Sequence, residues 1–401
     1  MFVRGNLGLV KKINKRTVLN LIRDQKMISR AEIAKVAGLN KATVSALVDE
    51  LIQENFVFES GIGASTGGRR PTMLKFNHLA GSIVGAELGV NYIYTVLTDL
   101  NANILWEKRI ELGEDTKQEE ILQQMVHMIQ EALENAPETP NGVMGIGIGV
   151  PGIVNSEQGK ILFAPNLRWD NVAFLPFLKE HLPNYMITIE NEAKLAALGE
   201  KWFGASRSFS NLVYISAGTG IGAGIIINNQ LYSGTEGQAG EIGHHIIQAN
   251  GLTCSCGNNG CWEMYASEKA IRRRLIEINR KEEADDFSID RLCSMAESGD
   301  REIAEIFQEI GTYLGIGLLN VVHAYNPEAI IIGNTLGRAG KWLLQHAEKI
   351  VNEKKLTKSS PNPVVVNSEL KEKSCVIGAV SSILDKILNP VEINVSEEEV
   401  F

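Results

Sequence analysis

Residues 243–263, GHHIIQANGLTCSCGNNGCWE, constrain the fold more than any other part of the chain. Three of the five cysteines, Cys254, Cys256 and Cys261, fall in this stretch, and His244 lies ten positions before the first of them. Several thiols and one imidazole within a short segment form a ligand set typical of a four-coordinate structural zinc site. We therefore predict that His244, Cys254, Cys256 and Cys261 bind a structural zinc ion.

The alternatives for these cysteines are a disulfide and ordinary buried thiols. The opening residues, MFVRGNLGLVKKINKR, lack the apolar core of a signal peptide, so we expect a cytoplasmic protein, in which a disulfide would be unusual. The chain has no run of about 18 apolar residues, so we expect no membrane-spanning helix. The Cys-x-Cys spacing differs from the commoner Cys-x-x-Cys, and spacing alone does not settle the choice. The other two cysteines, Cys293 and Cys375, are interpreted as buried thiols.

The charge is distributed unevenly along the 401 residues, a length that suggests two or three domains. Up to His78 there are 13 Lys and Arg against 6 acidic residues, a net charge of +7. Because the whole chain has a net charge of −9, the remainder carries −16. A basic head on an acidic body indicates a module that binds a polyanion, attached to a body that does not.

The basic head carries the signals of a helix-turn-helix. Ser29 is a suitable N-cap for a short helix over 30–37, Gly38 ends that helix, and Asn40 caps the next one. The second helix is expected to present its N-terminal residues to the major groove of DNA. The residues predicted to contact DNA from these helices are Ser29, Arg30, Asn40, Lys41, Ala42, Thr43 and Ser45.

Two short strands, 56–59 and 72–76, flank the loop GIGASTGGRRP and together predict a wing. Arg69 and Arg70 at the end of this loop are predicted to contact DNA, because the negative potential of a narrow minor groove attracts arginine. The alternative is a three-helix unit with a structural role alone, whose Lys and Arg side chains are exposed to solvent and do not bind DNA.

After a linker around 77–82, strands and helices alternate. Two strand sets, each followed by helices, indicate two α/β lobes with a cleft between them. The strands are expected over 82–88, 92–98, 104–110, 143–150, 186–190, 212–215 and 222–227, with helices over 121–133 and 192–203. We predict a winged helix-turn-helix domain over 1–78, a first lobe over 79–190, and a second lobe over 191–401. The second lobe is expected to hold the zinc site, and its C-terminal helix to pack back on the first lobe.

The body resembles the ROK family of repressors and sugar kinases along essentially its whole length. The resemblance rests on SAGTGIGAGIIINNQLYSGTEGQAGEIGHH at 216–245, on the Cys-x-Cys-Gly-x-x-Gly-Cys-x-Glu run at 254–263, and on ENEAKLAALGE at 190–200. The head, with NKATVSALVDEL and GGRRPTMLKFN, is most similar to xylose repressors of Gram-positive bacteria. The resemblance implies an actin-like, two-lobed body of the sugar-kinase type behind a winged helix-turn-helix, and the same four zinc ligands.

The resemblance also implies a sugar site. Asn166, Asn191, Glu241, His244 and Glu263 match the sugar-binding positions of the family, with His244 touching both the metal and the sugar. Gly152 is placed to offer a backbone N–H, and Glu192 to bind a hydroxyl. Carboxylates, an amide and an imidazole suit sugar hydroxyls, which both donate and accept hydrogen bonds. Each of these residues alone also fits a loop or capping role.

Two departures from the kinase pattern favour a sensor over an enzyme. Family kinases begin with Asp-x-Gly-Gly-Thr, a turn that admits nucleotide phosphates, whereas this chain has Glu87-Leu88-Gly89-Val90-Asn91. Val90 stands where the kinases have their second glycine, and a β-branched residue adopts a positive φ far less readily than glycine does. The kinases also use Asn-Asp, with the Asp as general base, whereas here Glu192 follows Asn191, and a displacement of about 1 Å can cost roughly 100-fold in rate.

We therefore predict a sugar-responsive transcriptional repressor without enzymatic activity. Its partners are operator DNA and a free monosaccharide, with xylose favoured and glucose as a possible competitor. A homodimer or higher homo-oligomer is expected, because winged-helix proteins usually bind two half-sites. Two alternatives stay open: a DNA-binding sugar kinase that phosphorylates an aldose with ATP, and a constitutive DNA-binding protein whose body only forms oligomers.

Overall fold

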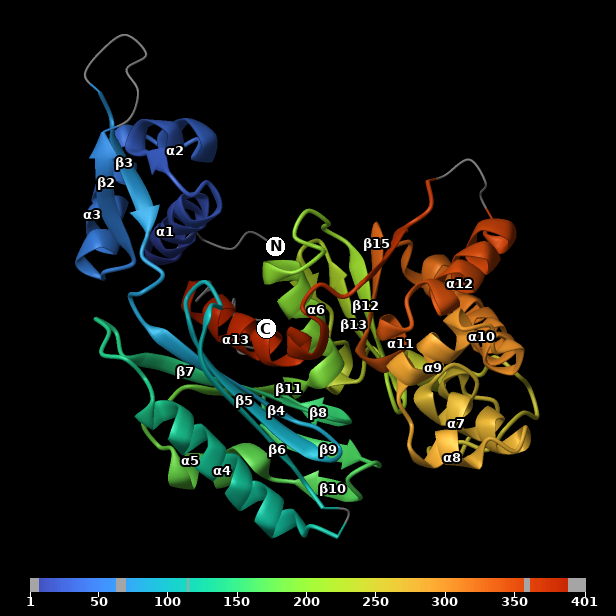
Figure 1. The fold of residues 1–401 in the computed structure, drawn as a ribbon. Coiled ribbons are helices and arrows are strands. Elements are labelled where there is room, and N and C mark those ends of the chain that lie inside the picture. The colour runs from blue at the N-terminus through green and yellow to red at the C-terminus, as the bar shows by residue number, and fades with distance from the viewer. Residues whose placement is uncertain (1–6, 63–69, 114, 357–360, 389–401) are drawn as a thin grey trace, which may run out of the picture.

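The computed structural model describes residues 7–62, 70–113, 115–356 and 361–388. Its N-terminal head contains three helices, α1 (Leu7–Asp24), α2 (Arg30–Ala37) and α3 (Lys41–Gln53). Three strands, β1 (Ile28–Ser29), β2 (Val57–Ile62) and β3 (Thr72–Phe76), form an antiparallel sheet in the order β1-β3-β2. This is the predicted winged helix-turn-helix, although the wing loop with Arg69 lies outside the described residues (Figure 1).

Local capping explains why the two central helices of the head begin and end where they do. The Ser29 side chain accepts from the backbone N–H of Glu32, and the Glu32 carboxylate accepts from the backbone N–H of Ser29, which completes a capping box. Gly38 ends α2 in the left-handed conformation at φ 66°. The Asn40 side chain then caps α3 by accepting from the N–H of Thr43 at 2.7 Å.

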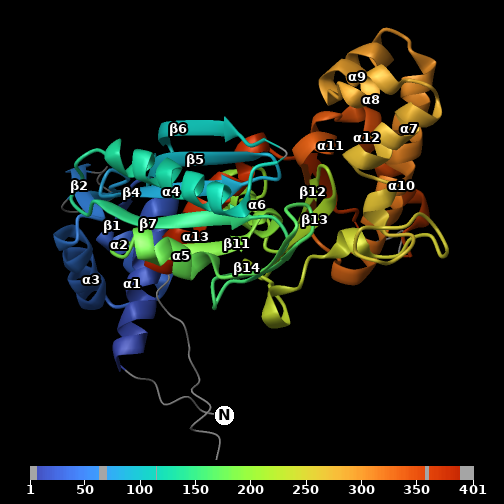
Figure 2. The same cartoon turned by 90° about the horizontal axis from the view of Figure 1, so that it is seen from below.

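The first lobe is built on a five-stranded sheet in the order β11-β7-β4-β5-β6. Its strands are β4 (Ser82–Leu88), β5 (Tyr92–Asp99), β6 (Ile104–Glu111), β7 (Val143–Val150) and β11 (Ile187–Asn191). Helix α4 (Gln118–Glu134) lies on one face of this sheet, as Figure 2 shows. Helix α5 (Phe174–His181) and a small sheet of β8 (Ile153–Asn155), β9 (Lys160–Ala164) and β10 (Trp169–Val172) complete the lobe.

The second lobe has its own five-stranded sheet, in the order β14-β13-β12-β15-β16. The strands are β12 (Leu212–Ala217), β13 (Ile221–Ile227), β14 (Gln230–Leu231), β15 (Ala329–Gly333) and β16 (Val364–Asn367). Short 3-10 turns, η1 (Thr235–Gly237), η2 (Ile242–His244), η3 (Trp262–Met264) and η4 (Lys371–Lys373), link these elements. The remaining helices are α7 (Glu268–Glu277), α8 (Lys281–Asp285), α9 (Ile289–Glu297), α10 (Arg301–Tyr325), α11 (Asn334–Arg338) and α12 (Lys341–Lys354).

Two helices at the centre of the body, α6 (Glu192–Phe203) and α13 (Ser374–Leu388), pack closely against each other (Figure 1). A Cβ atom at Gly378 would lie 1.7 Å from the carbonyl oxygen of Leu195, and one at Gly199 would lie 2.4 Å from that of Ser374. The helices therefore meet backbone to backbone, which glycine permits because it has no side chain. Helix α13 also contacts β4 and β7, so the C-terminal helix lies on the first lobe.

The head is joined to the first lobe by a continuous hydrophobic core and by hydrogen bonds. Val18 and Ile22 of α1 belong to the same buried cluster as Ile83 of β4 and Val380 of α13. His78 lies in the linker, and its Nδ1 is 2.7 Å from Oδ2 of the buried Asp99 carboxylate. The head is therefore packed against the body rather than attached by a loose tether.

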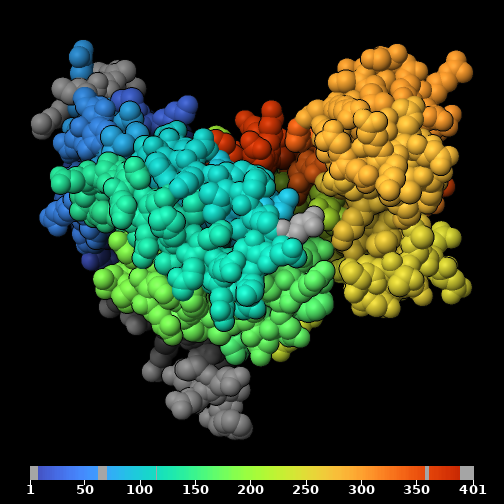
Figure 3. All heavy atoms as spheres, turned by 60° about the horizontal axis from the view of Figure 1, so that its bottom comes forward, coloured from blue at the N-terminus to red at the C-terminus, as the bar shows by residue number. Residues whose placement is uncertain are grey.

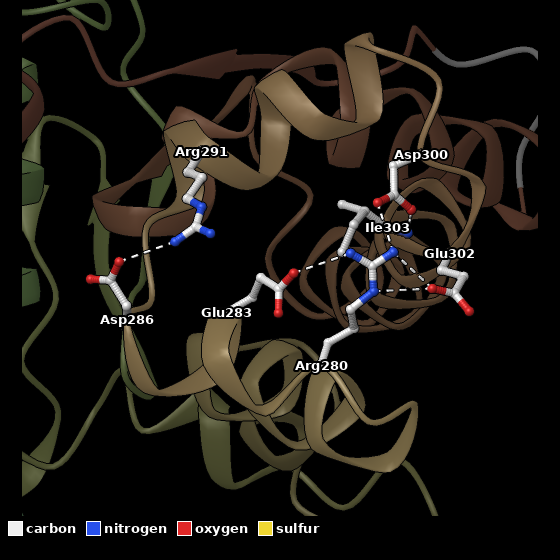
Figure 4. A network of polar contacts seen from close by, with 7 residues as sticks. All are labelled: Arg280, Glu283, Asp286, Arg291, Asp300, Glu302 and Ile303. Carbon is white, nitrogen blue, oxygen red and sulfur yellow. Dashed lines mark hydrogen bonds and ion pairs between the residues drawn. The ribbon is translucent and has the colours of Figure 1, made fainter.

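The outer end of the second lobe is braced by charged side chains, which Figure 4 shows from close by. The Arg280 guanidinium donates to Asp300 at 2.8 Å and to Glu302 at 2.8 Å, and to Glu283 at 3.1 Å. Asp300 in turn caps α10, because its side chain accepts from the N–H of Ile303. These contacts tie the α7–α8 connection to the start of α10. Among the helices of the described residues, none is long and apolar enough to span a membrane.

Candidate functional site

A cleft of about 1200 Å³ lies between the two lobes. The first lobe contributes the turn after β4, the turn after β7 and the β9–β10 hairpin, and the second lobe contributes the β12–β13 turn, η2, η3 and α11. Figure 3 shows the first lobe, in cyan and green, separated by a notch from the helical end of the second lobe, in orange. This position between domains is where ligand sites commonly form.

The structure brings every predicted sugar-binding residue to this cleft. The set comes from both lobes and from five separate segments of the chain, and it comprises Gly152, Asn166, Asn191, Glu192, Glu241, His244 and Glu263. Four of the six side chains are carboxyl or imidazole groups, and two are amides, while Gly152 offers only its backbone. Such a set can donate to and accept from several hydroxyls at once.

Asn191 is held in the cleft by hydrogen bonds within the protein. Its side-chain oxygen accepts from the backbone N–H groups of Ala193 and Lys194, which caps α6. Its side-chain nitrogen donates to the carbonyl oxygen of Gly152 at 2.9 Å and to the Glu192 carboxylate at 3.0 Å. All four hydrogen-bonding positions of this amide are therefore filled within the protein. Asn191 thus positions two other members of the set, Gly152 and Glu192.

Two glycines allow the chain to approach the cleft closely. Gly152 has φ 90°, and a Cβ atom there would lie 2.2 Å from the carbonyl oxygen of Phe163. A Cβ atom at Gly220 would lie 2.6 Å from Oε2 of Glu263. A side chain at Gly152 would clash with the backbone, so that turn requires glycine, whereas one at Gly220 would displace the Glu263 carboxylate.

Burial raises the pKa of three carboxyl groups in the cleft. Burial raises the pKa of Glu192 to about 8, and the charges of Glu241 and Glu87 add to this shift. Burial likewise raises the pKa of Glu87 to about 7, against the opposing effects of the Tyr92 hydroxyl and Arg109. The pKa of Glu241 is raised by burial as well. A neutral carboxyl group both donates and accepts, which suits an uncharged polyol better than a phosphate.

The four predicted metal ligands converge at the edge of the cleft. The candidate ligand atoms of His244, Cys254, Cys256 and Cys261 all lie within 4.8 Å of one another. Sγ of Cys254 is 3.6 Å from Nδ1 of His244, and Sγ of Cys256 is 3.6 Å from Sγ of Cys261. Tetrahedral zinc with Zn–S of about 2.3 Å and Zn–N of about 2.0–2.1 Å separates its ligand atoms by about 3.6–3.8 Å. The cluster can therefore hold a metal ion, and its thiols are not paired in disulfides.

The turn that receives phosphates in kinases is filled by a side chain here. The Tyr92 hydroxyl donates to the Glu87 carboxylate at 2.7 Å, and a Cβ atom at Gly89 would lie 2.3 Å from the Tyr92 ring. The Arg109 guanidinium covers the ring at 3.7 Å from its centroid. The ring, stacked under a cation and held by a hydrogen bond, occupies the space over Gly89. The ring is thus a second steric obstacle to nucleotide phosphates in this turn, in addition to the one expected from Val90.

Two further residues that the sequence does not assign to the site, Lys269 and Cys375, line the cleft. Nζ of Lys269, in the first turn of α7, donates to Oδ1 of Asn166 at 3.3 Å and so joins the two lobes across the cleft. The helix dipole disfavours a cation in the first turn of a helix. This unusual position of Lys269 is the one feature of the sequence that points to a special role. Cys375, interpreted as an ordinary buried thiol, is buried but also lines the cleft.

The predicted DNA-binding residues divide into exposed and engaged groups. Lys41, Ala42 and Arg70 are exposed, and Thr43 and Ser45 are half-buried at the start of α3. The Ser29 side chain is buried and caps α2, so its hydroxyl is not available to DNA, contrary to the prediction. Arg30 is engaged as well, because its guanidinium lies 2.8 Å from Asp49 and 3.3 Å from Glu59. The exposed Asn40 uses its side-chain oxygen as the cap of α3.

A winged helix-turn-helix packed on a two-lobed body with a polar cleft is the architecture of a ligand-responsive DNA-binding regulator. The ROK family model matches residues 83–386 of the chain. A xylose repressor of Caldicellulosiruptor bescii is 40% identical over 396 residues, which cover 96% of this chain and 98% of that protein. The chain belongs to the ROK family.

Solved structures agree with this assignment and confirm the predicted fold class. A crystal structure of a ROK family transcriptional regulator, described as a homolog of the E. coli MLC protein, has a TM-score of 0.81 at 30% identity. It covers 95% of this chain and 98% of its own. A ROK family glucokinase from Streptomyces griseus, in complex with glucose and AMPPNP, has a TM-score of 0.66 at 28% identity and covers 75% of this chain and 99% of its own. The regulator thus matches nearly the whole chain, and the kinase three quarters of it.

Proposed function

We propose that the protein is a sugar-responsive transcriptional repressor that binds operator DNA through its head and is released when a free monosaccharide binds in the cleft. D-xylose is the favoured effector, because the full-length relative described above is a xylose repressor. D-glucose is a possible competitor for the same site. The proposal rests on one observation above all: a polyol-type residue set lines a cleft in a chain that also carries a winged helix-turn-helix.

The cleft residues suit binding rather than phosphoryl transfer. Glu192 stands where the kinases have a shorter aspartate, and the longer side chain displaces the carboxylate from the position of that general base, which lowers the rate of proton transfer. The Tyr92 ring lies over Gly89, in the turn that would otherwise approach a phosphate. Carboxyl groups from Glu87, Glu192, Glu241 and Glu263 line the same space and disfavour a polyanion. We therefore propose no enzymatic activity for this chain.

Zinc is the ion that we propose for the His244–Cys254–Cys256–Cys261 cluster. Three thiols and one imidazole are ligands that zinc prefers, and a site closed by four protein ligands is structural rather than catalytic. When bound, the ion would fix the loop between η2 and η3. His244 and Glu263 belong to these elements, so the ion would hold two members of the sugar set in place.

DNA release requires that the sugar bind the DNA-incompetent state more tightly than the competent one. We propose that the sugar draws the lobes together, because its predicted contacts come from both of them. We further propose a homodimer or higher homo-oligomer, since a winged-helix protein usually contacts two half-sites. We propose a cytoplasmic location as well, because operator binding requires access to the chromosome.

The proposal is tested by fluorescence anisotropy on DNA from upstream of the gene for this protein and from the adjacent sugar genes. Titrations are run without sugar, with D-xylose and with D-glucose. Release by xylose supports the proposal, and tight binding that neither sugar changes contradicts the role of the cleft. Incubation with ATP and each sugar, followed by detection of sugar phosphate, tests the kinase alternative, and we expect none to form.

A further inference from the structure

Besides the hydrophobic core that it shares with β4 and α13, the head makes two further contacts of different character with the body. One is the first lobe, where His78 lies 2.7 Å from Asp99 and the side chain of Asn141 donates to the backbone oxygen of Glu54 at 3.2 Å. The other is the far end of α6, which packs on the sheet of the second lobe. The head therefore bridges two parts of the body that border the cleft from opposite sides.

The contact with α6 includes an arginine that lies over a tryptophan. Cζ of Arg23, in the last turn of α1, lies 4.5 Å from the centroid of the Trp202 ring, and Trp202 is the penultimate residue of α6. The Arg23 side chain is 22% exposed, and its Nε donates to Asp24 at 3.0 Å. A guanidinium stacked on an indole favours a defined face-to-face position, so a shift of either partner weakens the contact.

The opposite end of α6 lies in the cleft. Glu192 is its first residue and Asn191 its cap, and both line the space proposed for the sugar. The helix has 12 residues and is roughly 18 Å long at 1.5 Å per residue. A single rigid element therefore runs from the proposed sugar site to the DNA-binding head.

Helix α6 packs on the sheet of the second lobe as well as on α13, which lies on the first lobe. A Cβ atom at Gly224 of β13 would lie 2.5 Å from the carbonyl oxygen of Ala193, so the helix rests directly on the sheet. The Glu200 carboxylate, fully buried, accepts from the N–H groups of Ala205 and Leu370 and from the hydroxyl of Ser368, and so fixes α6 to the segment that follows β16. Because α6 contacts both lobes, a displacement of the second lobe relative to the first acts on this helix, and Trp202 lies at its end.

We propose that the Arg23–Trp202 contact transmits the state of the cleft to the DNA-binding head, with Trp202 as a positioning residue for α1. The inference rests on the proposed sugar response and adds the place where that response reaches the head. The first lobe holds the head through His78 and Asn141, while lobe closure moves the end of α6 against Arg23. The head then changes its orientation, and operator affinity falls.

The test uses the full-length chain and the variants Trp202→Ala and Arg23→Lys. The lysine keeps the positive charge but loses the planar stacking group. Operator affinity is measured by anisotropy with and without saturating D-xylose, and sugar affinity is measured separately by calorimetry. Lys341→Ala is the matched control, because it removes a different cation–tryptophan contact. In that contact Nζ of Lys341 lies 5.5 Å from the centroid of the Trp342 ring in α12.

Wild-type protein and Lys341→Ala are expected to lose about 5- to 150-fold in operator affinity when xylose binds, the usual range for coupled sites. Both contact variants should bind xylose and sugar-free operator as the wild type does, with a loss reduced to about twofold or less. Full release of both variants by xylose would overturn the inference. If Trp202→Ala no longer binds the operator, Arg23→Lys decides. Wild-type protein that binds neither xylose nor glucose would instead contradict the proposed function, and this inference with it.

Discussion

Sγ of Cys254 lies 3.0 Å from Oε1 of Glu263, so the metal cluster and the proposed sugar set are in direct contact. We predict that Cys256→Ser releases the metal and also weakens sugar binding, because the loop that carries His244 and Glu263 would lose its support. Zinc content of the purified protein and xylose binding by calorimetry are the two measurements. Both are expected to fall together, with sugar affinity reduced at least about 10-fold.

Cys293→Ser is the matched control, since Cys293 lies on α9 outside the cluster. It should keep both zinc and sugar binding. A metal-free Cys256→Ser protein that binds xylose normally would contradict the supporting role given to the ion. Unfolding of the variant would be recognised by circular dichroism.

The raised pKa of Glu192 predicts a pH-dependent stability. Because its folded pKa is about 8 and its ordinary value 4.5, the neutral carboxyl contributes stability that is fully present below about pH 4.5. That stability is lost as pH rises through about 8, by at most about 1.4 kcal/mol per pH unit. Glu192→Gln should therefore unfold at higher urea concentrations than the wild type at about pH 9, with the difference shrinking toward about pH 5.

Urea denaturation of sugar-free protein at several pH values measures this effect. Glu157→Gln serves as the control, because Glu157 is an exposed glutamate near the small sheet of the first lobe. It should follow the wild type at every pH. A difference between Glu192→Gln and the wild type that grows as pH falls would have the wrong sign for the mechanism.

Removing basic side chains from the predicted DNA surface should weaken operator binding and its salt dependence together. Lys41 and Arg70 are both exposed, the first at the start of α3 and the second at the base of the wing. Each alanine substitution that removes a phosphate contact should reduce the slope of log affinity against log salt by about 0.9. Anisotropy titrations at several salt concentrations give the slope. Lys349→Ala, on the exposed face of α12, should leave it unchanged, and an unchanged slope in Lys41→Ala would exclude that residue from the interface.

The backbone contact between α6 and α13 should tolerate no side chain. Gly378→Ala would place a methyl group 1.7 Å from the carbonyl oxygen of Leu195, and we expect the free energy of unfolding to fall by about 1–3 kcal/mol or more. Chemical denaturation measures this loss. Gly113→Ala is the control, because its Cβ atom would meet the Thr116 hydroxyl at an ordinary 3.4 Å. Equal stability of the two variants would show that the helices separate more easily than their packing indicates.

The head and the metal cluster can be predicted from the sequence because their signals are local. Ser29, Gly38 and Asn40 mark the ends of α2 and α3 within a few residues, and the structure places those helices at Arg30–Ala37 and Lys41–Gln53. The metal ligands also lie close together in the chain, and their atoms converge as expected. The sugar set required the family resemblance as well, since its members come from distant segments.

What the sequence does not predict depends on contacts between distant segments. Nothing in the residues around Arg23 indicates that it meets Trp202, because the contact forms only when the head is packed on the body. The same holds for Lys269 and Asn166, which face each other across the cleft from opposite lobes. Ser29 was expected at the DNA, but the capping role that marks it in the sequence is also what turns its hydroxyl inward.

The firm attachment of the head to the first lobe, through His78 and Asn141, has a consequence for the DNA itself. In an assembly of two copies, the distance and rotation between the two recognition helices would be set by the bodies and not by the reach of a linker. Such a protein should tolerate little variation in the spacing of its half-sites. Inserting about 5 base pairs, half a helical turn, between them would place one half-site on the wrong face of the duplex.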